Sequence, residues 1–287
     1  MSEIISGSKI MDSLKKIAKN SKANSINELR LILALERAIA RIENHPKLSD
    51  HIVFKGGFVL LKTIKTSRFT RDVDALALGL SRKQVPKLIE AALSFDLDDG
   101  FWFGDVTTKD LKDQGPYGGY RFTAAYQIGE VPSVGSSKIK RYSRVHLDVG
   151  FGDPVETLPK KKMMPSILRV GNPVSWSVYP FEYIFAEKLE ALFSRGSANS
   201  RAKDIYDMPL IFTECSNIKS LQKAIVRTFN NRKTPIPKSF LSTAKDFQLD
   251  VLRSSWLSVE LKDDGHSFDS SWDAFLEVLR SLESNKP

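Results

Sequence analysis

The sequence has one cysteine and few histidines. Because Cys215 is its only cysteine, the chain cannot form an internal disulfide bond or a cysteine-based zinc site, and it suits a reducing compartment. The four histidines show no spacing typical of metal ligands; they are His45, His51, His146 and His266. A zinc enzyme is therefore not expected.

Long apolar runs are also missing from the sequence. The first residues, MSEIISGSKIMDSLKK, lack the apolar core of a signal peptide. The longest apolar stretch, LRLILALERAIA, contains Glu36 and Arg37, so it cannot span a bilayer. We therefore expect a cytoplasmic protein with no membrane partner. Internal repeats and low-complexity tracts are absent as well, which favours an ordinary globular chain.

Basic residues outnumber acidic ones. The chain has 43 Lys and Arg against 34 Asp and Glu, which gives a formal net charge of +9 and a pI near 9.4. An excess of positive charge favours polyanionic partners such as nucleic acids, nucleotides or an anionic surface. Charge alone does not choose among these three.

Sequence periodicity predicts two different halves. A helix is expected over 26–44, because Ser25 and Glu28 form a capping box and apolar residues recur on one face. Further strands are expected at 51–54, 72–78, 101–109, 118–129 and 141–150, with helices at 57–64 and 81–95. After Asp153 the pattern becomes helical, at 180–195, 201–212, 217–230, 238–247 and 269–284.

This order of elements predicts an α+β fold. A mixed sheet with flanking helices, preceded by N-terminal helices, is expected over residues 1–158. A mainly helical C-terminal domain is expected over 159–287.

Two aspartates stand one residue apart on a predicted strand. Since side chains alternate along a strand, Asp72 and Asp74 point to one face and Val73 to the other. Like charges held side by side repel, and a divalent cation such as Mg²⁺ or Mn²⁺ would relieve that repulsion. Asp148, on the alternating segment RVHLDVGFGD, would join them if its strand lay beside 72–78. The alternative is a solvated strand end.

A pair of glycines precedes these aspartates. Gly56 and Gly57 follow a predicted strand and open a predicted helix. Backbone N–H groups at a helix N-terminus, with no side chain in the way, can bind an anion such as phosphate. A tight turn explains the glycines equally well when they are taken alone. The combination of strand, glycine pair, helix and Asp-x-Asp is more specific than either part.

A second block lies more than a hundred residues further along. In FEYIFAEKLEALFSRGSANSRAKDIYDM, Lys188 borders an apolar helical stripe, where its stem can pack while its ammonium reaches a cleft. Asp204 and Asp207 share one face of the next helix at i, i+3 spacing. An amphipathic helix pair with solvated charges is the simpler interpretation of this block by itself.

Together these segments resemble the AbiEii/AbiGii toxin family of nucleotidyltransferase-like proteins, which includes the MenT-type toxins. That family is part of the nucleotidyltransferase superfamily, whose fold is shared with DNA polymerase beta, so the resemblance implies a polymerase-beta-like core. The family pattern is K-G-G-[ST]-x-L followed by R-x-[ST]-x-D-x-D, and the matching residues are Lys55, Gly56, Gly57, Leu60, Arg68, Thr70, Asp72 and Asp74. Phe58 stands where the family has a small or hydroxylated residue, so a hydroxyl contact to phosphate would be missing. The second block is similar to the family's later A-E-K-L-x-A-L and R-x-K-D-x-Y-D motif.

The resemblance implies transfer of nucleotides from a nucleoside triphosphate by a two-metal mechanism. By the motif positions, the catalytic residues would be Asp72, Asp74, Asp148, Lys188 and Asp204, the first three also binding Mg²⁺ or Mn²⁺. The triphosphate would be held by Lys55, Gly56, Gly57, Arg68, Thr70 and Arg201. Lys188 would neutralise the triphosphate, and Asp204 would position Lys188, Arg201 or the acceptor.

The same resemblance implies a toxin of a toxin–antitoxin or phage-defence system, with tRNA 3′ ends as acceptor, blocked translation as outcome and a cognate antitoxin as partner. Basic clusters at Lys160–Lys162, at Lys138, Lys140 and Arg141, and at Arg144 suit an RNA backbone, or are merely solvated loops. One alternative is nucleotidyl or phosphoryl transfer to a protein or a small molecule. Another is a non-catalytic pseudoenzyme that binds RNA or an antitoxin.

Overall fold

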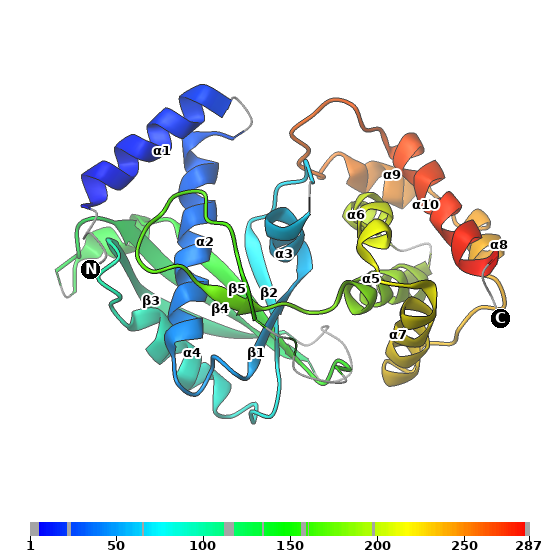
Figure 1. The fold of residues 1–287 in the computed structure, drawn as a ribbon, viewed down its shortest axis with the longest axis horizontal. Helices are drawn as coiled ribbons and strands as arrows, with labels where there is room; N and C mark the ends of the chain where they lie inside the picture. Colours follow the sequence, from blue (N-terminus) through cyan, green and yellow to red (C-terminus); the bar gives the residue numbers. More distant parts are fainter. Residues whose placement is uncertain are drawn as a thin grey trace. The chain divides into compact units, whose positions relative to one another are not determined.

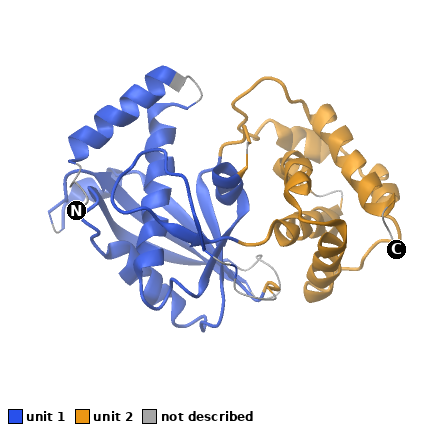
Figure 2. Ribbon diagram, in the orientation of Figure 1, with its two compact units in different colours: residues 1–63, 70–152, 157–178 blue, residues 64–69, 153–156, 179–287 orange. Residues whose placement is uncertain are grey.

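A computed structural model describes residues 6–21, 24–64, 66–111, 118–133, 135–155, 159, 161–196 and 199–284. The chain divides into two compact units (Figure 2). Unit 1 comprises residues 1–63, 70–152 and 157–178, and unit 2 comprises 64–69, 153–156 and 179–287. Residue 158, the last of the first predicted domain, lies outside the described residues. The division into domains 1–158 and 159–287 stays a prediction.

Unit 1 is built on a sheet of five strands in the order β1-β2-β5-β4-β3 (Figure 1). The strands are β1 (Ile52–Lys55), β2 (Asp72–Ala77), β3 (Phe101–Leu111), β4 (Gly119–Ile128) and β5 (Arg144–Phe151). Neighbours pair antiparallel except β2 and β5, which run parallel. The predicted α+β fold with a mixed sheet is confirmed.

The helices of unit 1 are α1 (Gly7–Ser21), α2 (Ile26–Asn44), α3 (Gly56–Thr63) and α4 (Val85–Ser94), with a 3-10 turn η1 at Ser137–Arg141. Helix α2 begins at the predicted capping box of Ser25 and Glu28. Helix α4 begins four residues later than predicted, because Ser81 donates its hydroxyl to Gln84 Oε1 at 2.8 Å within a preceding turn.

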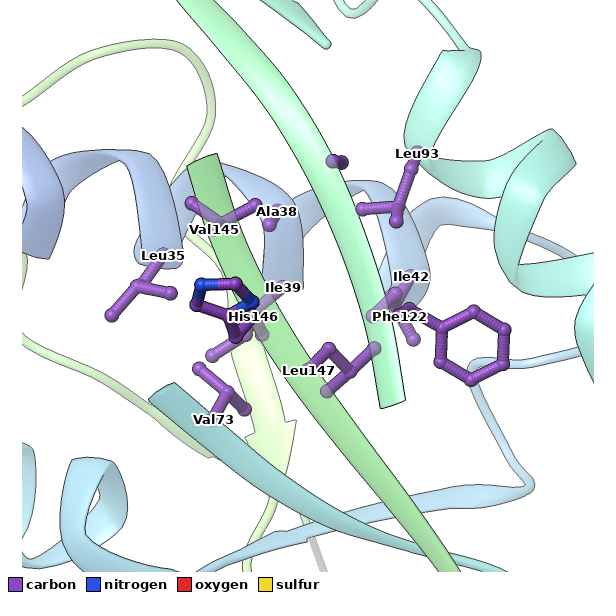
Figure 3. A pocket seen from close by; sticks show the side chains of 11 residues that line it. Leu35, Ala38, Ile39, Ile42, Val73, Leu93, Phe122, Val145, His146 and Leu147 are labelled. Carbon is purple, nitrogen blue, oxygen red and sulfur yellow. The ribbon is translucent and has the colours of Figure 1, made fainter. Parts of the chain in front are cut away.

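One face of the sheet is apolar and packs on α2. Figure 3 shows Leu35 and Ile39 of α2 with Val73 of β2 and Leu147 of β5 around a small pocket. These strand residues are fixed on this face by the period-two alternation that the sequence predicted. The aspartates that alternate with them therefore lie on the opposite face, whereas His146 of β5 also lines this pocket.

A two-stranded hairpin that the sequence analysis missed completes unit 1. Its strands are β6 (Lys161–Met163) and β7 (Ser175–Ser177), too short for a visible periodicity. Trp176 of β7 is almost fully buried, and its ring lies 5.8 Å from the rings of Phe54 and Phe58.

Unit 2 is helical, as predicted. Its helices are α5 (Phe181–Arg195), α6 (Ala202–Glu214), α7 (Ile218–Asn231), α8 (Phe240–Lys245), α9 (Asp250–Trp256) and α10 (Phe268–Ser284). The segment 64–69 belongs here because its backbone bonds that of 260–262, with Phe69 donating to Glu260 at 2.8 Å. Over the described part of the chain, no helix has the length and apolar character needed to cross a membrane.

Candidate active site

Three aspartates meet on the polar face of the unit 1 sheet. Strands β2 and β5 pair in parallel with Asp74 opposite Asp148 and Asp72 opposite His146. Since opposite residues of neighbouring strands share a face, all three carboxylates point away from α2. The condition set for Asp148, that its strand lies beside 72–78, is therefore met.

A row of charged residues crosses the sheet at this level. Lys55 of β1 stands opposite Asp74, Asp74 opposite Asp148, and Asp148 opposite Arg121 of β4. Along this row the side-chain charges are therefore positive, negative, negative and positive. Two adjacent carboxylates would repel strongly without such flanking charges.

Arg121 binds Asp148 with both arms of its guanidinium. Its Nε donates to Oδ1 at 2.7 Å and a terminal nitrogen donates to Oδ2 at 2.7 Å, while the arginine side chain remains 41% exposed. Two parallel N–H···O bonds of this kind are among the stronger polar contacts in proteins. The hydrogen bonds to Asp148, with the charges of Asp72 and Asp74, raise the pKa of Arg121. Both oxygens of Asp148 are thus acceptors in this pair.

Gly56 is required where it stands. Its φ is +75°, and a Cβ at this position would lie only 1.9 Å from Oδ2 of Asp74. A side chain would therefore meet both a strained backbone and the Asp74 carboxylate. The glycine pair opens α3 with its first N–H groups close to Asp74, so an anion bound there would need a cation between itself and the carboxylate.

Thr70 forms a hydrogen bond with an aspartate in this structure. Its hydroxyl donates to Asp72 Oδ1 at 2.9 Å, and the residue is buried. The contact orients the first aspartate of the pair. Its predicted contact with a phosphate stays a prediction.

Phe58 is a core residue. It is completely buried, and its ring stacks on Trp176 at an interplanar angle of 17°. Aromatic contact of this kind adds to the energy of burial. Phe58, which departs from the family pattern, therefore packs against Trp176 of β7 in the core.

The second block forms a buried charge cluster inside unit 2. Lys188 of α5 donates to Asp204 at 2.5 Å and to Asp207 at 2.8 Å, both on α6. Lys188, Asp204 and Asp207 are each less than 10% exposed. The simpler interpretation, a helix pair with solvated charges, is therefore wrong, because these charges are buried and paired.

Two arginines complete this cluster. Arg201 binds Asp204, and Arg68 grips Asp207 through two bonds of 2.7 and 2.9 Å. Burial works to raise the pKa of both aspartates, but the neighbouring cations outweigh it and lower it. Burial likewise works to lower the pKa of Lys188, and the two carboxylates outweigh it and raise it. Lys188, Asp204 and Asp207 are therefore held in their charged forms.

The predicted site residues thus fall in two groups. Unit 1 holds Lys55, Gly56, Gly57, Thr70, Asp72, Asp74 and Asp148, and unit 2 holds Arg68, Lys188, Arg201 and Asp204. Arg68 is predicted to contact the nucleotide. In the structure, three of its N–H groups donate hydrogen bonds to the Asp207 carboxylate and the Phe69 carbonyl.

Sequence reasoning missed the roles of Asp207 and Arg121. For Asp207, its shared face with Asp204 was a signal. For Arg121, the only signal was its place on the polar side of an alternating strand, and its partner depends on the strand register.

The carboxylates of this face can be compared with the set of ligands that a metal ion requires. Among the residues that the structure describes, no group of three or more Asp, Glu, His or Cys side chains could hold one. Asp72 and Asp74 still provide the oxygen donors that Mg²⁺ prefers, one oriented by Thr70 and the other against Gly56. The chain therefore fits a cation held by this pair, while Asp148 is engaged by Arg121.

The apolar pocket of Figure 3 lies on the other face of the sheet. Its lining comes from α2, α4 and the strands and includes no carboxylate, lysine or arginine. A triphosphate needs cationic and N–H donors. This pocket is therefore a packing feature of the core.

Two solved structures have a similar fold. The structure is similar to that of JHP933 from Helicobacter pylori, with a TM-score of 0.51 and 18% identity over 88% of this chain and 92% of that one. A second H. pylori protein, named provisionally as a nucleotidyltransferase, has a TM-score of 0.51 and 17% identity over 87% and 92% of the two chains. An antigenic nucleotidyltransferase-like protein from Paracoccidioides brasiliensis has a TM-score of 0.39 and 15% identity over 72% and 89%.

At these identities the likeness concerns the fold alone. No curated protein sequence matches the chain. The model of the family described as "Nucleotidyl transferase AbiEii toxin, Type IV TA system" matches residues 37–283, which include both motif blocks and most of the chain. The chain therefore belongs to the AbiEii family of nucleotidyltransferase toxins.

Proposed function

We propose that the protein is a metal-dependent toxin enzyme that transfers nucleotides from a nucleoside triphosphate to the 3′ end of tRNA and so blocks translation. The observation that carries the proposal is the parallel pairing of β2 and β5, with Asp74 against the glycine pair of α3. Membership of the AbiEii toxin family supports the same reaction class.

The residues of unit 1 have distinct roles in this proposal. Asp72 and Asp74 hold Mg²⁺ or Mn²⁺, and Thr70 fixes the carboxylate of Asp72. The N–H groups of Gly56 and Gly57 donate to the phosphates at the N-terminus of α3. When bound, the cation supplies the positive charge that lets a triphosphate lie beside two carboxylates.

The transfer step is a substitution at the α-phosphorus. The acceptor hydroxyl oxygen forms a bond to that phosphorus, and the bond to the oxygen bridging the α- and β-phosphorus breaks. Pyrophosphate leaves with the bonding electrons, and the hydroxyl proton passes to solvent. The chain contributes by positioning the triphosphate and by stabilising its negative charge.

The cluster in unit 2 contributes positive charge. Lys188 is held by two carboxylates, whereas the side chain of Arg201 is 30% exposed at the edge of the cluster. The roles proposed for this cluster rest on the family motif: Lys188 neutralises the triphosphate, and Asp204 positions Lys188, Arg201 or the acceptor. Three cations against two carboxylates leave this cluster with one net positive charge.

A tRNA acceptor is supported by charge. The 3-10 turn η1 exposes Lys138, Lys140 and Arg141, and basic side chains of this kind bind a phosphate backbone. Other predicted basic residues are engaged inside unit 1: Lys161 binds Glu43 at 2.9 Å, and Arg144 binds Asp105. Lys160 lies outside the described residues.

The biological setting is proposed on the family alone. We place the protein in the cytoplasm, in a toxin–antitoxin or phage-defence system, with a cognate antitoxin as its partner. The antitoxin would restrain an activity that otherwise depletes usable tRNA.

A transfer assay tests the function. The protein is incubated with Mg²⁺, each α-labelled nucleoside triphosphate in turn, and tRNA, protein extract or small acceptors. We expect label at the tRNA 3′ end, and Asp74→Asn should reduce it to background with an unchanged melting temperature. Asp110→Asn, on the exposed part of β3 in the same sheet, is the matched control and should keep full transfer.

Other outcomes of this assay would refute tRNA as the acceptor, or the proposal that the protein is an enzyme. Label found only in protein or in a small molecule would replace tRNA as acceptor. No transfer to any acceptor, together with no binding of triphosphate by calorimetry, would indicate a non-catalytic binding protein instead. Full transfer by Asp74→Asn would refute the role given to the aspartates.

A further inference from the structure

Arg121 occupies a position that the predicted mechanism assigns to a metal ion. A second divalent cation would have to bind Asp148, yet both oxygens of that carboxylate accept hydrogen bonds of 2.7 Å from the guanidinium. A cation approaching those oxygens would meet both the N–H groups and their positive charge. Arginine keeps that charge at any working pH.

The strand register builds this pair into the fold. Arg121 stands directly opposite Asp148 in the antiparallel pairing of β4 with β5, and Phe122 beside it is held on the apolar face near α2. The guanidinium therefore reaches Asp148 from the neighbouring strand without a long loop. Opposite charges that face each other directly across two strands stabilise a sheet.

The neighbouring charges point the same way. Lys55 stands opposite Asp74 and Arg121 opposite Asp148, so positive side chains already flank the carboxylates on both sides. The carboxylates that Arg121 does not grip are Asp72 and Asp74, and these are the ligands that remain for a divalent cation.

We propose that this enzyme binds a single divalent cation, at Asp72 and Asp74, and that the guanidinium of Arg121 is the fixed positive charge at Asp148 in place of a second metal ion. The proposal rests on the proposed metal-dependent transfer. Arg121 is a positioning residue: it holds Asp148 and supplies a permanent charge on this face. It contributes no ligand to the bound ion.

Counting bound Mn²⁺ by its electron paramagnetic resonance signal tests the proposal without using activity. Wild type should bind one ion, and Asp148→Asn should also bind one, because Asp148 is not a ligand. Arg121→Gln should bind two, since it frees the third carboxylate. Arg82→Gln is the matched control: this arginine is 40% exposed, pairs with Asp110 and should leave the count at one.

The comparison of wild type with Asp148→Asn decides the matter even if Arg121→Gln folds poorly. Two ions in wild type and one in Asp148→Asn would overturn the inference while leaving the proposed transfer reaction intact. No ion in wild type would overturn both. The double variant Arg121→Gln/Asp148→Asn removes the pair without leaving a buried charge, and a count of one supports the proposal while two would refute it.

Discussion

Replacing Lys188 by methionine should destabilise unit 2 strongly. Methionine keeps most of the apolar stem but removes the ammonium that binds Asp204 at 2.5 Å and Asp207 at 2.8 Å. Removing one partner of a buried ion pair costs about 3–5 kcal/mol, since a charge is left without compensation. Here each aspartate retains one arginine, Arg201 or Arg68, so we expect the lower limit, about 3 kcal/mol.

Urea unfolding followed by circular dichroism measures this change. For a unit of this size, about 3 kcal/mol corresponds to a fall in melting temperature of roughly 10 °C. Lys203→Met is the control, because Lys203 is exposed on α6 and a surface change there should alter the free energy of unfolding by less than about 0.5 kcal/mol. If Lys188→Met lost no more than Lys203→Met, the buried cluster would not be a stabilising unit and the reasoning would fail.

Two further predictions concern the glycine pair and the pH dependence of stability. Gly56→Ala should lose about 1–2 kcal/mol from its positive φ and should also lose transfer, because the new Cβ displaces Asp74. Gly135→Ala, with a similar φ of +76° and open space around it, should lose stability but keep transfer, and equal transfer by both variants would contradict the contact with Asp74. Because neighbouring cations lower the pKa of Asp204 and Asp207 below the ordinary 3.8, their stabilisation is complete above that pH and is lost as the pH falls through the lower folded-state values. Urea unfolding at a series of pH values below about 5 should show this fall in wild type, and a constant free energy of unfolding would refute it.

Local patterns in the sequence predicted much of the fold. The capping box at Ser25 and Glu28 marks the start of α2, because its hydrogen bonds join residues three apart. The alternation around Val73 places two aspartates on one face of β2, because side chains two residues apart point to the same side of a strand. The elements β6, β7 and α9 escaped prediction, and the two strands have only three residues each, too few for a period to show.

Contacts between distant residues were beyond this reasoning. Arg68 and Asp207 are separated by 139 positions, so nothing in the local sequence reveals that this arginine binds a carboxylate in unit 2. From the sequence, Phe58 indicated only that a hydroxyl contact to phosphate is missing. Its packing role was not visible, because its partner Trp176 lies on a hairpin that was not predicted. Each of these depends on how segments pair after folding.

By itself, the sequence determined that Asp72 and Asp74 share one strand face, that a glycine pair opens the preceding helix, and that the chain resembles a nucleotidyltransferase toxin. These follow from interactions over a few residues and from motif spacing. Tertiary structure alone decided which cations the carboxylates face. Strand register brings Arg121 to Asp148, and helix packing brings Lys188 to Asp204, because ion pairs form between neighbours in space and not between neighbours in the chain.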